Sequence, residues 1–202
     1  MIHILCADIS SADSIVFTAL YDAASPERRL RADSYLQEAD KLRCVTADAL
    51  LRAALGTDAF QVETGPRGKP FIRNRQDFHY NLSHSGRYVV LAWGSSPVGV
   101  DVQEHRPLAR MEALAARFFT AEEQDFIRQS PQDRFYEVWS GKESYLKYLG
   151  TGLQKELNSF GLFSLEPEVR WTHRTLPGGC SLSLCAAEPE GTFRLLDVKQ
   201  LL

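Results

Sequence analysis

The most constraining feature of the sequence is the stretch from Trp139 to Gly150, which predicts a helix with charge on one face that ends at a glycine. Glu143 and Lys147 are four residues apart, so they share a helix face one turn from each other, with Trp139 one turn earlier. A carboxylate that can hold a metal ion or take a proton, beside an amine that can meet a phosphate, indicates phosphate chemistry. The alternative is an ordinary surface Glu–Lys pair, which contributes about a few tenths of a kcal/mol to a helix.

A second feature is the strict alternation of residues 97–103, which predicts a half-buried strand with its valines toward the core. Gly99, Asp101 and Gln103 then share the opposite face, while Glu104 points the other way. Two residues along a strand span about 6.6 Å, so side-chain oxygens of Asp101 and Gln103 can converge on one cation. A polar strand face that simply meets water explains the same pattern.

A third feature is the Ser-His-Ser-Gly segment at residues 83–86, which predicts a turn between strands near 77–83 and 87–94. Hydroxyls and an imidazole beside free backbone amides would form an anion cradle. His84 as the base of a serine nucleophile is the weaker hypothesis, because sequence neighbours rarely attain triad geometry and no G-x-S-x-G segment accompanies them. A purely structural histidine in a turn is the remaining alternative.

Four motifs, in this order and spacing, resemble those of the Sfp-type 4'-phosphopantetheinyl transferases: Gly68-Lys69-Pro70, Asn81 to Ser85, Gly99 to Gln103, and Trp139 to Lys147. The resemblance implies transfer of 4'-phosphopantetheine from coenzyme A to a serine of an apo acyl or peptidyl carrier protein, with adenosine 3',5'-bisphosphate as the other product. Such a transfer depends mainly on positioning and electrostatic stabilisation. A divalent ion, Mg²⁺ or alternatively Mn²⁺, would neutralise the diphosphate.

The resemblance also implies roles for the matching residues. Asp101, Gln103 and Glu143 would bind the metal ion. Glu143 would also take the serine proton, and Lys147 would stabilise the leaving group, so Asp101, Glu143 and Lys147 are the expected catalytic residues. The residues expected to bind coenzyme A are Gly68, Lys69, Pro70, Ser83, His84, Arg43 and Lys142, and the basic run at 28–31 either adds to that contact or is a solvated helix end.

Gln103 departs from the family pattern, which usually has glutamate at this position. An amide oxygen coordinates a cation but brings no charge, so the metal ion is expected to bind more weakly before coenzyme A arrives.

The patterning predicts an α+β fold. Helices are expected from Ser25-Pro26, over 35–54, and near 110–118, 121–129 and 132–149. Strands are expected at 2–8, 60–64, 70–73, 77–83, 87–94, 97–103, 160–164, 168–174, 180–187 and 193–198. The resemblance implies two similar subdomains in pseudo-twofold arrangement, residues 1–96 for coenzyme A contacts and 97–202 for the metal site and catalytic helix.

Composition limits the remaining classes of function. A net charge of −3 without a long basic block argues against a nucleic-acid binder. No apolar run approaches the roughly 20 residues of a membrane span, and the N-terminus lacks the basic region of a signal peptide. Four cysteines without C-x-x-C spacing are typical of a reduced, cytoplasmic protein. A chain that holds both halves of the site is expected to be a monomer.

Two alternatives stay open. One is a coenzyme-A-binding protein without transferase activity, in which Gln103 has weakened the metal site. The other is an interaction module whose charged residues are all surface groups. A partly apolar surface is expected to dock the carrier protein, although residues with the spacing of its candidates are more often part of a core: Met111, Leu114, Phe118 and Phe119.

Overall fold

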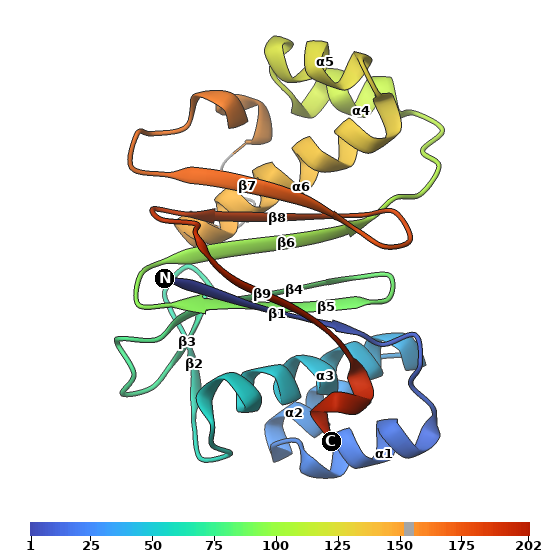
Figure 1. The fold of residues 1–202 in the computed structure, drawn as a ribbon, viewed down its shortest axis with the longest axis vertical. Helices are drawn as coiled ribbons and strands as arrows, with labels where there is room; N and C mark the ends of the chain where they lie inside the picture. Colours follow the sequence, from blue (N-terminus) through green and yellow to red (C-terminus); the bar gives the residue numbers. More distant parts are fainter. Residues whose placement is uncertain (152–155) are drawn as a thin grey trace.

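The computed structural model describes residues 1–151 and 156–202, which form two β-sheets in the middle of the molecule with helices at both ends (Figure 1). Helices α1 to α3 cover the first sheet, α6 packs against the second sheet, and α4 and α5 lie beyond it (Figure 1). The mixed α+β architecture expected from the sequence is therefore confirmed.

The first sheet has the strand order β4-β5-β1-β9. Its strands are β1 (Ile2–Asp8), β4 (His79–Ser85), β5 (Tyr88–Gly94) and β9 (Gly191–Asp197). Strand β9 runs parallel to β1, whereas the other pairs are antiparallel. Strand β9 thus belongs to the second half under a division after residue 96, yet it pairs in the sheet of the first half. A separate hairpin joins β2 (Val62–Thr64) to β3 (Pro70–Ile72).

The second sheet is antiparallel, with the order β6-β8-β7. Its strands are β6 (Val98–Glu104), β7 (Arg170–Leu176) and β8 (Cys180–Ala186). Both faces of β6 are buried over residues 98–102, so the half-buried strand expected here is wrong. The reason is that a long helix (Pro131–Leu149) packs on the face that carries Asp101, while the valine face packs with Val90 and Ala92 of β5.

Six α-helices accompany these sheets in the described part of the chain: α1 (Ser14–Ala23), α2 (Pro26–Asp33), α3 (Glu38–Leu55), α4 (Met111–Phe118), α5 (Ala121–Arg128) and α6 (Pro131–Leu149). Their caps follow local chemistry. The Ser25 hydroxyl accepts a hydrogen bond from Arg28 N, and Thr120 with Glu123 forms the expected capping box. Short 3-10 turns are η2 (Leu157–Ser159), η3 (Leu162–Ser164) and η4 (Val198–Leu201).

Three local predictions are corrected. Helix α1 was not predicted, although the Asp13 carboxylate accepts from Val16 N at its start. The strand predicted at 160–164 is wrong, because this segment contains the turn η3. The predicted turn at residues 83–86 is also wrong, since strand β4 extends to Ser85 and the turn is Gly86-Arg87, where Gly86 has φ 54°.

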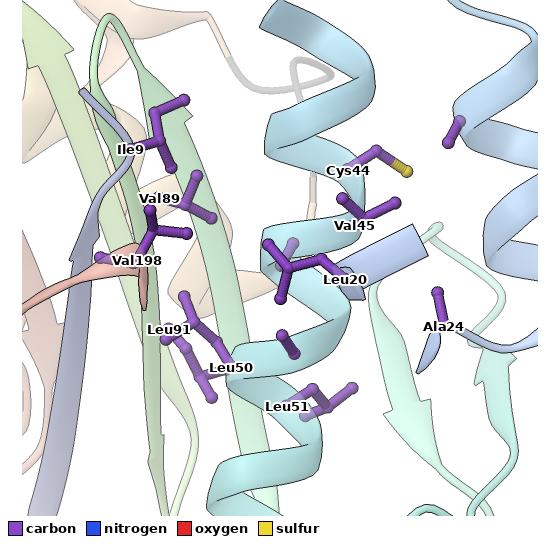
Figure 2. Close-up of a cluster of buried hydrophobic side chains, with 14 of the residues drawn as sticks. Ile9, Leu20, Ala24, Cys44, Val45, Leu50, Leu51, Val89, Leu91 and Val198 are labelled. Atoms are coloured by element: carbon purple, nitrogen blue, oxygen red, sulfur yellow. The ribbon is translucent and has the colours of Figure 1, made fainter. Parts of the chain in front are cut away.

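The core under the first sheet is apolar. Leu50 of helix α3 lies beside Leu91 of the sheet, whereas Val45 and Leu51 point from the other side of the same helix, and all four are fully buried (Figure 2). This burial supplies a large part of the driving force for folding in this half. None of the described helices is long and apolar enough to cross a membrane.

Candidate active site

Gly99 determines how closely α6 approaches β6. A Cβ atom at this position would lie 2.0 Å from Ser144 O and 2.3 Å from Tyr148 N, both backbone atoms of α6. Only glycine therefore permits this contact. The close approach brings the α6 side chains at positions 143 and 147 to the strand that carries Asp101.

Asp101 lies at the centre of the site and is 3% exposed. The Lys147 ammonium donates to Asp101 Oδ1 at 2.7 Å, and the Ser83 hydroxyl donates to the same oxygen at 2.8 Å. The Gln103 amide nitrogen donates to Asp101 Oδ2 at 2.9 Å. A buried carboxylate is costly unless it is paired and hydrogen-bonded, and these donors satisfy both of its oxygens.

Glu143 faces the same region. Burial, and then the negative charge of Asp101, raise the pKa of Glu143, while the Lys147 ammonium partly offsets this effect. The two expected metal ligands on β6 and α6 are therefore close enough to influence each other. A carboxylic acid with a raised pKa beside a second carboxylate is typical of catalytic centres.

The donor set fits a small, hard cation. Within residues 1–151 and 156–202, no three His, Cys, Asp or Glu side chains converge as metal ligands. The available oxygens here belong to two carboxylates, Asp101 and Glu143, and to the amide of Gln103. All are oxygen ligands, which Mg²⁺ prefers, and a cation would relieve the repulsion between the carboxylates.

The Asn-x-Ser-x-Ser motif of β4 joins the two sheets. Asn81 Oδ1 accepts from Val100 N at 2.9 Å, and the hydroxyls of Ser83 and Ser85 accept from Val102 N and Glu104 N at 3.2 and 3.0 Å. The three acceptor side chains of β4 and the three donor amides of β6 both recur at every second residue, so each acceptor lies opposite a donor. We call this set of three hydrogen bonds the seam.

The seam changes the role expected for Ser83. Its hydroxyl accepts from Val102 N and from Lys147 Nζ, at 2.9 Å, and donates to Asp101. One donor and two acceptor positions are thereby used. In this arrangement Ser83 positions the Asp101 carboxylate, and the expected contact of Ser83 with coenzyme A is not supported.

His84 alternates to the other side of β4 and is exposed. Desolvation of the ring, and then the positive charges of Arg43 and Lys147, hold its pKa below the ordinary value, with a smaller contribution from Arg31. The Arg43 guanidinium donates to Gly86 O at 2.7 Å and to Asp40 at 2.7 Å. The expected contact residues His84 and Arg43 are thus brought together in a positively charged group, which suits an anion.

Lys69 lies in a different place from the one expected. Its ammonium donates to Val98 O, Lys147 O and Tyr148 O at 3.0, 2.8 and 3.1 Å, which uses all three N–H groups. Burial lowers its pKa to about 8. Gly68, with φ 85°, and Pro70 form the turn that presents it. In this structure the side chain ties the turn to the end of α6 rather than facing a ligand.

Lys142, which was expected to contact coenzyme A, lies in the interior in this structure. Its side chain is fully buried and donates to both Glu123 oxygens at 2.6 and 2.8 Å and to Phe160 O at 2.6 Å. Glu123 also accepts from Thr120 N and Leu162 N, so this pair fixes the 160–162 segment on α5 and α6. The capping box was a sequence signal for Glu123, but nothing in the sequence indicated its burial.

A pocket of about 500 Å³ opens beside Glu143. Phe118, Trp139 and Leu157 give it apolar walls, and Arg117 with Glu143 gives it charge. Of the expected docking residues, Phe119 belongs to the core at 2% exposure, while Phe118 reaches this pocket.

The chain is similar in sequence to known proteins. A family profile described as the 4'-phosphopantetheinyl transferase superfamily matches residues 97–183, which include Asp101, Glu143 and Lys147. The chain is 32% identical over 189 residues to the 4'-phosphopantetheinyl transferase Sfp of Bacillus subtilis, covering 82% of this chain and 83% of that protein.

Two further relatives show similar identity. The 4'-phosphopantetheinyl transferase ffp of Bacillus subtilis is 31% identical over 195 residues, with 85% of each chain covered. The 4'-phosphopantetheinyl transferase psf-1 of Bacillus pumilus is 36% identical over 144 residues, with 66% of this chain and 61% of that protein covered.

Proposed function

Because the chain belongs to the 4'-phosphopantetheinyl transferase superfamily, as an Sfp-type member, we propose that it transfers 4'-phosphopantetheine from coenzyme A to a serine hydroxyl of an apo carrier protein. The observation that supports this most directly is the meeting of three residues from two distant segments. Lys147 of α6 binds Asp101 of β6 at 2.7 Å, and Glu143 faces both.

In the proposed reaction, the serine oxygen attacks the phosphorus next to pantetheine. The bond from this phosphorus to the bridging oxygen breaks, and adenosine 3',5'-bisphosphate leaves with that oxygen. Glu143 accepts the serine proton. Its raised pKa suits this role, because a base works best when its pKa lies nearer the working pH.

The other residues of the site supply charge and position. Lys147 places a positive charge beside the leaving diphosphate, while Ser83 and Gln103 orient Asp101. A Mg²⁺ ion held by Asp101, Glu143 and the Gln103 oxygen would neutralise charge on the diphosphate. His84 and Arg43 would bind coenzyme A phosphates, with Arg31 adding positive charge.

We further propose that residues 1–96 and 97–202 are two related subdomains in pseudo-twofold arrangement, with the site between them and with β9 of the second completing the sheet of the first. In support, each half has one long helix over a sheet, and both helices end at a glycine in the left-handed region, Gly56 with φ 65° and Gly150 with φ 67°. The seam joins the two halves at the site.

We also propose that the protein is a cytoplasmic monomer. A single chain provides both the positive group around His84 and the carboxylates of β6 and α6, so it needs no second copy. The four cysteines are free and buried, which agrees with a reducing compartment.

The decisive test is the mass of apo carrier proteins after incubation with the protein, coenzyme A and Mg²⁺. Transfer adds one phosphopantetheine to the carrier, and Glu143→Ala is the matched inactive control. Thermal stabilisation by coenzyme A without any mass gain, at any Mg²⁺ concentration and with several carriers, would instead support the alternative of a coenzyme-A-binding protein without transferase activity.

A further inference from the structure

Gln103 presents its amide nitrogen to Asp101 although the proposed metal-binding role needs its oxygen. The nitrogen lies 2.9 Å from Asp101 Oδ2. An ionised carboxylate oxygen only accepts hydrogen bonds, so the neighbouring amide atom must be the N–H donor. The orientation of the Gln103 amide in this arrangement is therefore determined by its partner.

Asp101 depends on this donor. The other oxygen, Oδ1, is engaged by Lys147 and Ser83, so the amide of Gln103 is the side chain that satisfies Oδ2. With the carboxylate only 3% exposed, loss of a donor is not compensated by bulk water. Glutamate at position 103 has no N–H to donate and would add a third negative charge beside Asp101 and Glu143.

We propose that Gln103 is a two-state residue. In one state its N–H holds Asp101 Oδ2, and in the other its amide is rotated by about half a turn, so that Oε1 joins Asp101 and Glu143 around a divalent cation. This inference rests on the proposed function for the presence of a cation at the site. It goes further because it assigns two roles to the neutral Gln103 side chain. The amide N–H donates to Asp101 when the cation is absent, and the amide oxygen coordinates the cation when it is bound.

The cost of this arrangement is affinity. A cation must displace the Gln103 N–H from Asp101 before it gains the amide oxygen, whereas glutamate offers a charged ligand at once. When the cation is absent, glutamate cannot donate a hydrogen bond to Asp101. Its negative charge would also repel the carboxylates of Asp101 and Glu143. The protein thus exchanges metal affinity for stability of the unliganded site.

The test is thermal unfolding of the whole protein in EDTA and across an Mg²⁺ titration, without coenzyme A or carrier. Gln103→Glu should lower the Tm in EDTA by about 2–6 °C, a shift expected for a chain of this size from loss of one or two polar interactions. Mg²⁺ should restore that loss, with a midpoint about tenfold lower than in the parent protein. Gln103→Met should lower the Tm in EDTA similarly, but Mg²⁺ should restore less than in the parent.

Gln124→Met is the matched control. Gln124 also donates one amide hydrogen bond, to Phe119 O at 2.9 Å, but it lies outside the site. This variant should lose stability without any change in the response to Mg²⁺. In the parent protein, the side-chain amide signals of Gln103 in NMR spectra, assigned by their loss in Gln103→Met, should shift on addition of Mg²⁺.

Two results would overturn the proposal. An unchanged Tm of Gln103→Glu in EDTA would mean that the N–H bond does not hold Asp101, and an Mg²⁺ response of Gln103→Met equal to that of the parent would mean that the amide oxygen is no ligand. Neither measurement involves phosphopantetheine transfer. A failed carrier assay with an intact Mg²⁺ response would therefore refute the proposed reaction and leave the role of Gln103 standing.

Discussion

Helices α3 and α6 occupy similar places, but they pack against sheet faces of different polarity. They are 18 and 19 residues long, and both end at a left-handed glycine. Helix α3 packs aliphatic side chains such as Leu50 against the first sheet. Helix α6 buries Ser140 and Ser144 together with the charged Lys142.

The second sheet explains the difference, because its face toward α6 is polar. In the pairing of β6 with β8, Asp101 lies opposite Ser183 and Gly99 lies opposite Cys185. Ser140 and Ser183 share a hydrogen bond of 2.8 Å, and Ser144 donates to Cys185 Sγ at 3.2 Å.

Hydrogen bonds are directional, whereas aliphatic contacts tolerate rearrangement. We infer that α3 mainly provides stability and that α6 provides position. The contrast predicts that equivalent changes in the two helices will have different effects. Changes in α6 should alter the transfer rate, whereas changes in α3 should alter mainly the free energy of unfolding.

The largest expected effect is on activity. Glu143→Ala should lower the transfer rate by about 10²- to 10⁴-fold, the range for loss of a general base, with little change in fold. The measurement is the rate of carrier mass gain. Glu38→Ala, which removes an exposed acid from the first turn of α3, is the control and should load carrier at the parent rate. Equal rates for all three proteins would refute the role of Glu143.

Leu50→Ala in α3 should lower the free energy of unfolding by about 2–5 kcal/mol, because it leaves a cavity in a fully buried core. The transfer rate per folded molecule should stay unchanged. Leu146→Ala, at an equally buried position of α6, should lower both quantities. Denaturant unfolding and initial rates measure the two effects, and loss of activity by both variants alike would break the proposed division of roles.

Gly99→Ala should lower the free energy of unfolding by about 1–3 kcal/mol, since its Cβ would meet the α6 backbone. It should also slow transfer by about 10²-fold through displacement of α6. Gly56→Ala is the comparison in α3, where a Cβ has no neighbour within 4 Å and only the positive φ costs energy. A Gly99→Ala protein with full activity would show that close approach of α6 is unnecessary.

The smallest effect concerns pH. Because burial and Asp101 raise the pKa of Glu143 above its ordinary value of 4.5, the folded protein holds this proton more tightly than the unfolded chain does. Its contribution to stability is fully present below the unfolded pKa and is lost as the pH rises through the raised folded pKa. In EDTA, the stability of Glu143→Gln relative to the parent should therefore increase with pH from about 4.5 upward. A pH-independent difference would mean that the pKa is not raised.

The sequence predicts features that depend on local chemistry. The capping box of Thr120 and Glu123 is one, and the alternating strand at Asp101 is another. The resemblance predicted Asp101 and Glu143 as parts of one site, and in the structure the charge of Asp101 reaches Glu143 and raises its pKa. Helical spacing placed Lys147 on the face of α6 that now reaches Asp101.

The features that the sequence did not predict are contacts between residues that are distant in the sequence. Lys142 looks like an ordinary helix cation until Glu123 and Phe160 surround it. The apolar segment at 160–164 has the composition of a strand, but its backbone groups at Phe160 and Leu162 bind those buried charges instead of a neighbouring strand. Ser83 and Ser85 are common in turns, yet here they complete the hydrogen bonding of β6. Such partners lie about twenty residues or more away and leave no local pattern.

Strand β9 has a consequence for synthesis of the chain on the ribosome. It pairs in parallel with β1, and the other strands of the described residues all lie between these two in the sequence. During translation one edge of β1 therefore stays unpaired until residues 9–190 and β9 itself have emerged. Nascent chains are exposed to faulty association at that edge until the sheet closes.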